Sequence, residues 1–455
     1  MKKSIVTICL LAAAAIAQPA MSGQFHKAHE KGIAGRYIVV LKPSALGVTK
    51  NSSFVPDAAD TKRLADSVAE RFSARQVAVY GHVGQFLIEA SEDVAKRLAQ
   101  DSRVLLVEQD ARIEISAIPS CYDNVSTFPL ANSYDPTSPQ TISCWDPQLN
   151  CTDNWGLDRI DQTTGSQSAH TLDSKFYFDA KGTGTHIYVL DTGIIKTHTE
   201  FALPLGANRV GAGINLVPGE TSTNTDDDIG HGTHVSAIAA GRRFGVAKAA
   251  TIHPVRIFQN GGATISTAVS GVNWIASNHV DPAVVNMSFN YNKALVTTTS
   301  LDSAVTTLIS TYGVTVVNSA GNWNQDATDF SPTGVSAVIV AAGLDWVNNQ
   351  HWGASPTNGC RTNGCGSNWG SGVDLYAPAT DVLAALGSGE NNLACTLTGT
   401  SMAAPHVTGV VAQYLEDNPT ATPATIHNFI TSTATAGVVT GTLGGSPNLL
   451  LFTDL

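Results

Sequence analysis

The stretch "HIYVLD", residues 186–191, decides the fold of the larger part of this chain, because it is a short apolar run that ends in an aspartate. Short runs rich in β-branched residues are expected of strands that are buried on both faces of a parallel sheet. Similar runs follow it at 251–258, 283–289, 314–320 and 337–342. Helical patterns lie between these runs, at 231–240, 264–277, 300–311 and 400–416. Residues 155–455 are therefore predicted to form a three-layer α/β domain, with a mainly parallel β-sheet flanked by helices.

The N-terminus has the composition of a targeting segment. Lys2 and Lys3 precede the apolar run "IVTICLLAAAAIA", which ends in Ala15-Ile16-Ala17. This order is typical of a secretory signal peptide with an A-x-A cleavage site. A membrane anchor is the alternative, but the run is shorter than the roughly 20 residues that a spanning helix needs. We therefore predict a signal peptide at 1–17, a secreted, extracellular protein, and no membrane association once the signal is removed.

A small unit of alternating strands and helices is predicted at residues 36–115. Its apolar patterns indicate strands at 36–43, 84–90 and 104–110, and helices at 61–76 and 91–100, with Ser91 capping the second helix. Two helices set among strands are typical of a small α+β, ferredoxin-like sandwich. Residues 116–154 show no period and are rich in Pro, Ser, Asn and Thr, so a loop-rich, cysteine-containing extension is expected there.

Charge and cysteine content narrow the class of protein. Residues 1–117 contain 15 Lys and Arg against 12 Asp and Glu, whereas residues 118–455 contain 11 against 25. The acidic, lysine-poor body argues against nucleic-acid binding, and the opposite signs suit two parts of one chain that associate. An even number of cysteines remains after signal removal, which suggests disulfides in an exported protein. They are Cys121, Cys144, Cys151, Cys360, Cys365 and Cys395. Their pairing stays open, with Cys144–Cys151 and Cys360–Cys365 as candidate short loops.

The stretch "LTGTSMAAPHVTGVVAQYL", residues 397–415, places a serine at the start of a predicted helix. Pro405 is expected in the first turn of this helix, because only there is its missing N–H not needed. Ser401 taken alone would be an N-cap, since serine is among the best capping residues. The alternative is a nucleophile, held where backbone N–H groups converge.

Three further residues favour the nucleophile. Asp191 and Asn322 end predicted strands, and His231 opens a predicted helix. With Ser401 they supply a nucleophile, a base, an acid that orients the base and an oxyanion donor. His231 and His234 also form an H-x-x-H pair, but the zinc-protease pattern H-E-x-x-H needs a glutamate that is absent here. We expect His234 and the other histidines to be structural.

The motifs around these residues resemble those of the subtilisin-like serine proteases. "VLDTGI", "GHGTHVSAIAAG", "SAGN" and "GTSMAAPHVTG" occur in the order Asp, His, Ser, which is the order in subtilisin. "NWGLDRID" at 154–161 and "GSPNLLLF" at 445–452 resemble the proteinase K-like branch, and residues 36–115 resemble the inhibitory prodomain of the family. The resemblance implies a secreted serine endopeptidase, made as an autoprocessed zymogen.

The roles of four residues follow from this resemblance. Ser401 would attack the scissile carbonyl and form an acyl-enzyme. His231 would take the serine proton and pass it to the leaving amine, while Asp191 would orient His231. Asn322 and the backbone N–H of Ser401 would hold the oxyanion.

Substrate binding is implied by the same resemblance. A polypeptide substrate would add as an extended strand between two segments, "NGGA" at 260–263 and "SFN" at 288–290. The implied substrate-binding residues are Gly261, Gly262, Ser288, Phe289, Asn290, Ala320 and Gly321. The family usually has glycine at the position of Asn290. The asparagine predicts a preference for small or medium side chains at the first pocket.

No cofactor is expected for catalysis, but the resemblance implies a structural calcium ion. Its ligands would be the main-chain carbonyls of Ser336 and Val338 and the carboxylate of Asp374, which are the hard oxygen ligands that calcium prefers. Asp374 as an ordinary turn residue is the alternative. Three consecutive aspartates, Asp226 to Asp228, form an acidic run. This run is either a calcium site or a solvated loop.

Two other functions compete with the protease. A catalytically inactive relative would bind peptides or its own prodomain, yet every catalytic residue type is present. A secreted lipase or esterase would need a G-x-S-x-G sequence around its serine, and Ser401 has none. As partners we expect polypeptide substrates and the chain's own prodomain as an intramolecular inhibitor, with no nucleic acid and a monomeric enzyme.

Overall fold

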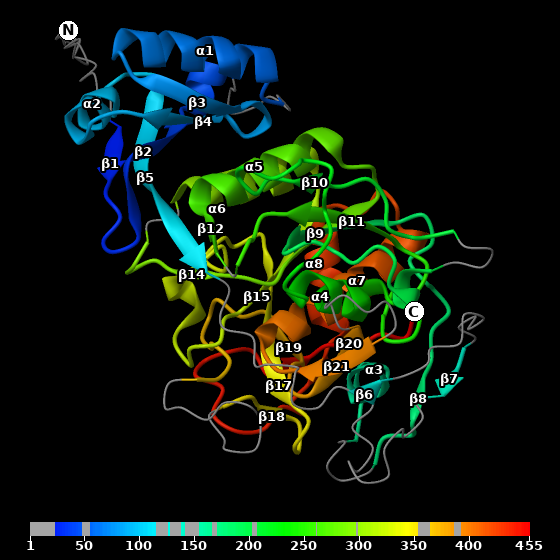
Figure 1. Ribbon diagram of the computed structural model, residues 1–455. Coiled ribbons are helices and arrows are strands. Elements are labelled where there is room, and N and C mark those ends of the chain that lie inside the picture. The colour runs from blue at the N-terminus through cyan, green and yellow to red at the C-terminus, as the bar shows by residue number, and fades with distance from the viewer. Residues whose placement is uncertain are drawn as a thin grey trace, which may run out of the picture.

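A computed structural model gives the structure of the chain. It describes residues 23–47, 55–114, 126–127, 138–141, 154–165, 171–202, 207–260, 262–296, 299–353, 365–385 and 393–455. The predicted signal peptide, most of the predicted extension and Gly261 lie outside the described residues. The two largest parts are an N-terminal unit, residues 23–114, and an α/β domain, residues 154–455 (Figure 1).

A ten-stranded sheet forms the centre of the α/β domain, as the apolar runs predict. Its strand order is β10-β11-β9-β13-β15-β17-β19-β23-β22, with β18 paired to β17. The strands from β10 to β23 are parallel to their neighbours, and β18 and β22 are antiparallel. Their bounds are β9 His186–Asp191, β10 Ile214–Asn215, β11 Thr251–Arg256, β13 Ala283–Met287, β15 Thr315–Ser319, β17 Ile339–Asp345, β18 Gln350–His351, β19 Leu375–Pro378, β22 Thr435–Ala436 and β23 Leu449–Leu450.

Helices cover both faces of this sheet, which confirms the three-layer prediction. Alternate side chains of β9 enter different cores: Ile187 and Val189 pack in the cluster that contains α4, α7 and α8, whereas Tyr188 and Leu190 pack with α5 and α6. This division follows from the two-residue period of a strand. The helices are α3 Trp155–Ile160, α4 His231–Ala240, α5 Ile265–Asn278, α6 Thr299–Tyr312, α7 Thr400–Asp417 and α8 Pro423–Thr433.

Several short strands lie outside the main sheet. They are β6 Ser126–Thr127, β7 Gln140–Thr141, β8 Lys175–Phe176, β12 Gly262–Thr264, β14 Tyr291–Asn292, β16 Phe330–Ser331, β20 Val382–Ala385 and β21 Leu393–Leu397. β6 and β7 belong to the predicted extension and pair with β21 and β8, so two short bridges attach its described parts to the α/β domain. Cys365 and Cys395 are both disulfide-bonded. The other cysteines lie outside the described residues, so the pairing stays a prediction.

The N-terminal unit is a five-stranded sheet with two helices. The sheet order is β1-β5-β2-β4-β3. The elements are β1 Gln24–His26, β2 Gly32–Leu41, α1 Ala58–Arg71, β3 Arg75–Tyr80, β4 Gln85–Glu89, α2 Glu92–Leu98 and β5 Val104–Glu114. One face of the sheet forms a separate core with α1 and α2, and Ser91 caps α2 by accepting the N–H of Val94 at 3.3 Å.

Two details of this unit differ from the prediction. The helix predicted at 61–76 ends at Arg71, because Ser73 has a φ of 55° and turns the chain into β3. The alternation of β3 is weak, so the sequence pattern did not separate it from the helix. The unit also begins before residue 36, since β1 pairs with β5 and β2 begins at Gly32.

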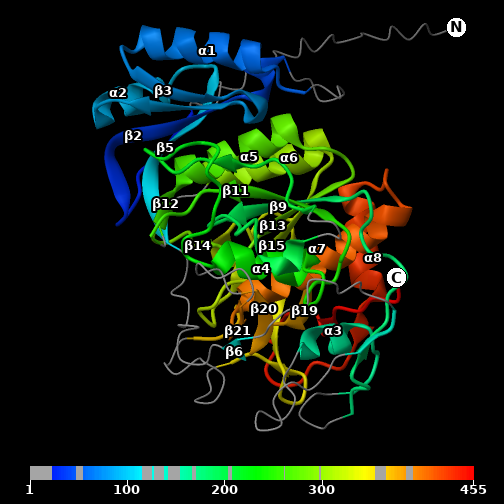
Figure 2. The same cartoon turned by 45° about the vertical axis from the view of Figure 1, so that its right-hand side comes forward.

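The N-terminal unit lies against α5 and α6, with α1 and α2 on its far side (Figure 2). Apolar side chains of its second sheet face, including Ile38 and Leu87, belong to the same cluster as α5 and α6. Two buried carboxylates on β5 also reach the starts of these helices. Glu108 accepts the N–H and hydroxyl of Ser300 on α6, both at 3.0 Å. Asp110 accepts the N–H and hydroxyl of Ser266 on α5, at 3.0 and 2.7 Å.

Candidate active site

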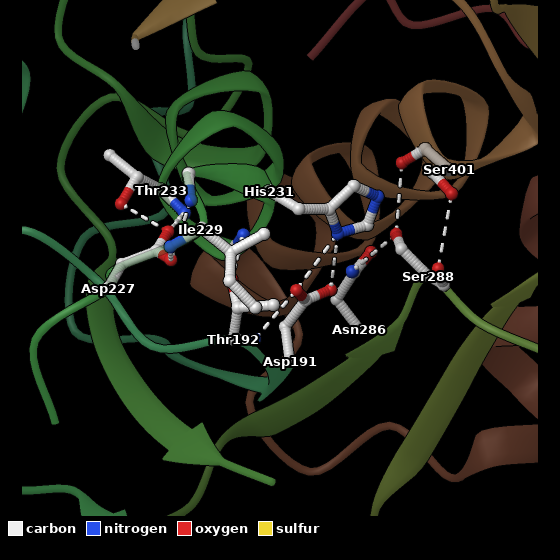
Figure 3. Close-up of polar contacts among 11 residues, drawn as sticks. Asp191, Thr192, Asp227, Ile229, His231, Thr233, Asn286, Ser288 and Ser401 are labelled. Carbon is white, nitrogen blue, oxygen red and sulfur yellow. Dashed lines mark hydrogen bonds and ion pairs between the residues drawn. The ribbon is translucent and has the colours of Figure 1, made fainter. Parts of the chain in front are cut away.

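Asp191 and His231 form the buried polar pair that the sequence predicts. Asp191 is the last residue of β9, where the carboxyl ends of parallel strands meet, and its side chain is fully buried. His231 is the first residue of α4. Its Nδ1 lies 2.9 and 3.0 Å from the two carboxylate oxygens of Asp191 (Figure 3). The N–H of Thr192 also donates to Asp191 at 2.7 Å, which fixes the carboxylate.

Different features of the surroundings of His231 change the pKa of its imidazole in opposite directions. Burial lowers the pKa of the imidazole, but the charge of Asp191 and the hydrogen bond to it raise the pKa. The charge of Asp227 adds to this effect, so that the pKa of His231 lies above its ordinary value of 6.5. A carboxylate on Nδ1 leaves Nε2 as the nitrogen that can accept a proton from a nucleophile.

Ser401 is the second residue of α7 and does not cap that helix. The N-cap position is Gly399, where no side-chain hydrogen bond is made. In Figure 3 the imidazole of His231 turns its free edge toward Ser401. In this structure the Ser401 hydroxyl donates to the backbone carbonyl of Ser288 at 3.1 Å. The cap interpretation is therefore wrong, and the serine side chain remains directed into the site.

Pro405 lies beyond the first turn of α7, which corrects the prediction. It is the sixth residue of a helix that begins at Thr400. Its missing N–H leaves the carbonyl of Ser401 without its usual partner four residues ahead. The hydroxyl of Ser288 donates to that carbonyl at 2.9 Å and replaces the missing bond. The side-chain amide of Asn286 donates to the same hydroxyl at 2.9 Å, so β13 supports the start of the helix.

Asn322 lies beside the serine, with its amide orientation fixed from α7. Its Oδ1 accepts the backbone N–H and the hydroxyl of Thr400, at 2.9 and 2.7 Å. The Thr400 hydroxyl also accepts the N–H of Gly321 at 3.0 Å. Because Oδ1 is used in this way, Nδ2 of Asn322 is the group that remains to donate to a bound oxyanion. Gly321 has a φ of 107°, a value at which a side chain would be strained.

One of the two predicted substrate-binding segments is paired with the N-terminal unit. β12 is antiparallel to the end of β5, with Gly262 opposite Glu114 and Ala263 opposite Ile113. Gly261 lies outside the described residues, so its predicted role is not placed. The end of the N-terminal unit thus adds a strand to the segment that the resemblance assigns to substrate. Figure 1 shows β5 running from the N-terminal unit down to β12.

The second segment follows β13, and its side chains point in different directions. The ring of Phe289 is buried 5.4 Å from that of Phe258, in the core with α5 and α6. Only the backbone of Phe289 is therefore available to a substrate. The side chain of Asn290 donates from Nδ2 to the carbonyl of Ser319 at 2.7 Å, next to the fully buried Ala320.

The predicted calcium ligand Asp374 is engaged by protein groups. Its Oδ1 lies 3.0 Å from Nε2 of His427, and its Oδ2 accepts the N–H of Val340 at 2.8 Å. The hydrogen bond to Asp374 and its charge raise the pKa of His427. Ser336 is exposed and Val338 is buried. Both oxygens of Asp374 therefore have protein partners, and calcium binding by these residues stays a prediction.

The described residues contain no group of three or more His, Cys, Asp or Glu side chains that could hold a metal. His234 is buried and its Nε2 contacts the carbonyl of Cys395 at 3.1 Å, so the H-x-x-H pair does not converge. Burial lowers the pKa of His234 to about 3 and that of His406 to about 4, in keeping with structural roles.

Sequence reasoning missed three residues that support the site. Thr400 orients Asn322, Thr192 accepts the N–H of Gly232 at 2.8 Å, and Asp227 binds the start of α4. Each stands within one to four residues of a predicted catalytic residue. Their closeness to the predicted catalytic residues was the available signal. A short polar side chain beside a strand end or a helix start, however, is first interpreted as a turn or cap residue.

Comparisons with known proteins agree with this geometry. Residues 182–448 match the Subtilase family. The extracellular serine proteinase of Thermus sp. (strain Rt41A) is 37% identical over 368 residues, which are 80% of this chain and 74% of the relative. The cuticle-degrading serine protease of Arthrobotrys oligospora is 32% identical over 462 residues, 98% of both chains.

A solved structure shows the same fold. A crystal structure of a cold adapted subtilisin-like serine proteinase is 36% identical, covers 66% of this chain and 97% of its own, and has a TM-score of 0.56. In the part of the chain that the structure describes, no helix has both the length and the apolar character needed to cross a membrane. The matching family, these relatives and the buried Asp–His pair beside Ser401 together show that this chain belongs to the subtilase family of serine proteases.

Proposed function

We propose that the chain is a secreted serine endopeptidase in which Ser401, His231 and Asp191 form the catalytic triad. The observation that carries this assignment is the bond between Nδ1 of His231 and Asp191, formed where the imidazole faces Ser401 at the start of α7. The name of the extracellular serine proteinase of Thermus supports secretion, as does the predicted signal peptide at 1–17.

The reaction would begin with the transfer of one proton. The Ser401 hydroxyl leaves the Ser288 carbonyl and turns to Nε2 of His231, which takes its proton as Oγ attacks the scissile carbonyl. The C–N bond then breaks, and the imidazolium returns the proton to the leaving amine. Water hydrolyses the acyl-enzyme by the same sequence in reverse. Asp191 stays ionised and stabilises the imidazolium at each stage.

The oxyanion would be held by two donors of different kinds. One is Nδ2 of Asn322, whose orientation is fixed because Thr400 occupies Oδ1. The other is the backbone N–H of Ser401, at the positive end of α7. Donors fixed before reaction stabilise developing charge at little cost of reorganisation.

The N-terminal unit is proposed to be an inhibitory prodomain. Its β5 adds a strand to β12, as a substrate would, and Glu108 and Asp110 bind the starts of α6 and α5. The chain beyond residue 114 would then enter the site and be cut by Ser401 during maturation. An inhibitor that is continuous with the enzyme keeps the cleft filled until that cut is made.

Replacing the nucleophile tests the assignment directly. Ser401→Ala is expected to lower kcat roughly a millionfold, the loss caused by removing a nucleophile in subtilisin itself, and to leave the precursor uncut. Hydrolysis of a peptide anilide and N-terminal sequencing of the secreted protein give the two readouts. Ser432→Ala, on the exposed side of α8, serves as the control.

Normal maturation of the Ser401→Ala chain expressed alone would refute the nucleophile assignment. Covalent labelling of wild-type Ser401 by a phosphonate would exclude an inactive relative.

The pH dependence tests the base. Neutral imidazole is the active form, so kcat/KM is expected to fall as pH decreases through the pKa of His231. That pKa is raised above 6.5 by Asp191, which places the midpoint of the acid limb above that of an ordinary histidine. A profile of kcat/KM between about pH 5 and 9 measures it. A flat profile across this range would contradict a histidine base.

A further inference from the structure

Asp227 differs from its two acidic neighbours because it is buried. Asp226 and Asp228 are exposed, whereas Asp227 is 6% exposed. Its Oδ1 accepts the backbone N–H groups of Ile229 and Gly230, at 3.0 and 2.7 Å. Burial raises the pKa of Asp227 above its ordinary value, and the hydrogen bonds from the backbone of Gly230, Thr233 and Ile229 and from the Thr233 hydroxyl, which favour the charged form, oppose that rise. The acidic run therefore contains one structured carboxylate between two solvated ones.

The other oxygen of Asp227 holds the first turn of α4. Oδ2 accepts the N–H and the hydroxyl of Thr233, at 2.8 and 2.7 Å (Figure 3). The N-cap of this helix is Gly230, which has a φ of 101° and no side chain that could cap. Asp227 supplies the capping oxygen from three residues upstream. The residue that this cap fixes in place is His231, the first of the helix.

A cation site at the acidic run does not fit these contacts. Both oxygens of Asp227 are used by hydrogen bonds to the protein. Asp228 forms an ion pair with Arg256, with its Oδ2 3.0 Å from Nη2 of Arg256. Two of these four donors belong to Thr233 of α4, and the other two are the N–H groups of Ile229 and Gly230 just before it, so the function of Asp227 concerns the start of that helix.

Few other charged or titratable groups face His231 from the described elements. Asp191 contacts it from β9. His234, one turn along α4, stays neutral because burial lowers its pKa to about 3. Tyr291 lies near Asp191 and stays protonated, since burial raises its pKa well above 10. Asp227 is thus the second negative group that acts on His231, and its charge raises the pKa of the imidazole.

We propose that Asp227 is a positioning residue for His231, which fixes the first turn of α4 and electrostatically stabilises the imidazolium formed during proton transfer. The proposal rests on the proposed role of His231 as the base. A dual role of this kind separates Asp227 from an ordinary cap, because a cap alone would affect stability without changing the protonation of the imidazole.

Asp227→Asn removes the charge and keeps one accepting oxygen. Made in the full-length precursor and measured after maturation, it is expected to move the acid limb of kcat/KM to lower pH. The midpoint of the acid limb is expected to shift by roughly 0.3 to 1 pH unit, which is the effect of removing one charge that is partly screened. kcat should fall roughly tenfold with little change in KM, because the base is displaced and the substrate-binding segments are not.

Two variants separate charge from structure. Asp227→Glu keeps the charge and should retain the wild-type acid limb even if kcat falls. Asp228→Asn removes a carboxylate that is 53% exposed, and should leave the limb unchanged because solvent screens that charge.

The outcomes are distinct. An acid limb that stays at the wild-type pH in Asp227→Asn, with only a lower melting temperature, would overturn the proposal and leave a simple cap. If that variant does not mature, Asp227→Ser, which keeps a capping oxygen without charge, is measured in its place. If neither uncharged variant folds while Asp227→Glu does, the charge is needed for folding of the α4 start rather than for the imidazole, and the proposal is equally overturned. A wild-type enzyme without an acid limb would instead refute His231 as the base.

Discussion

Asn290 is the residue at which this chain departs from the family pattern of its substrate-binding segment. Its φ is not positive, so the backbone does not require the glycine that the family usually has. Its Nδ2 donates to the carbonyl of Ser319 at 2.7 Å, which links the segment 288–290 to the segment that contains Ala320 and Gly321. By the family resemblance these two segments are the walls of the first specificity pocket. The side chain therefore occupies space between them.

Asn290→Gly is expected to enlarge that pocket. kcat/KM should rise for a phenylalanine substrate more than for an alanine substrate, by roughly tenfold in their ratio, about the effect of one steric contact in a pocket. Tetrapeptide anilides that differ only at the residue before the scissile bond measure this ratio. Asn348→Gly, at an asparagine with a φ of 53° outside the site, controls for the substitution type. A ratio that does not change would show that Asn290 does not restrict the pocket.

The residues proposed to be catalytic could be found in the sequence because each one lies at or near the end of a strongly patterned element. Asp191 is the last residue of a buried strand, and His231 is the first residue of a helix that contains one of the four family motifs. The position of Pro405 could not be predicted, because the carbonyl that it leaves free is satisfied by Ser288, more than a hundred residues away in the chain. Tertiary contacts of this kind do not appear in a local pattern.

Among the helices and strands, the hydrophobic pattern of the sequence predicted those in the core well and those at the periphery poorly. The helices α4 to α7 and the strands β9, β11, β13, β15 and β17 lie within two or three residues of their predicted bounds. These elements are buried, so their apolar period is strong. The missed elements, such as β3, β12 and β20, are short or half-exposed, and partners distant in the sequence hold them in place. For such segments, pairing with a neighbouring strand determines the structure more than the β-propensity of their own residues does.

The contact between α8 and the loop before β19 gives a prediction about metal binding. Calcium could bind Asp374 only if His427, on α8, released Oδ1. His427→Ala should therefore increase the rise in melting temperature that calcium produces, because a ligand that binds only the folded state stabilises it. Thermal unfolding with calcium chloride and with chelator measures this rise in both proteins. Asp374→Asn is the control, and an equal calcium effect in that variant would place any bound calcium elsewhere.

At the scale of the whole molecule, the N-terminal unit and the α/β domain share one apolar cluster and two buried carboxylates. Burial raises the pKa of Glu108 to about 8, although Ser300 donates two hydrogen bonds to it, and burial also raises the pKa of Asp110. In the separated unit these carboxyls would be exposed and have ordinary values near 4. Association therefore takes up protons between about pH 4 and 8, and affinity must decrease as pH increases through that range.

The N-terminal unit supplied as a separate polypeptide, residues 23–115, should inhibit the mature enzyme and bind it more weakly at higher pH. One linked proton gives up to a tenfold change in Kd per pH unit. Initial rates of peptide anilide hydrolysis by the mature wild-type enzyme, measured with increasing amounts of the added unit from pH 5 to 9, give the inhibition constant and its slope with pH. Glu108→Gln keeps an accepting oxygen for Ser300 and should reduce the slope. A slope unaffected by this change would assign the pH dependence to other groups, and absence of binding at micromolar concentration would contradict the prodomain assignment.

The strand β9 also determines which changes of length this molecule can tolerate. Its alternate residues enter two different cores, and its last residue is Asp191. A substitution at one of these positions alters one contact. An insertion or deletion of a single residue would exchange the side chains of the two cores and turn the carboxylate away from the imidazole at the same time. Gains and losses of residues should therefore be tolerated in the loops that join the elements, whereas β9 can vary in composition only at a fixed length.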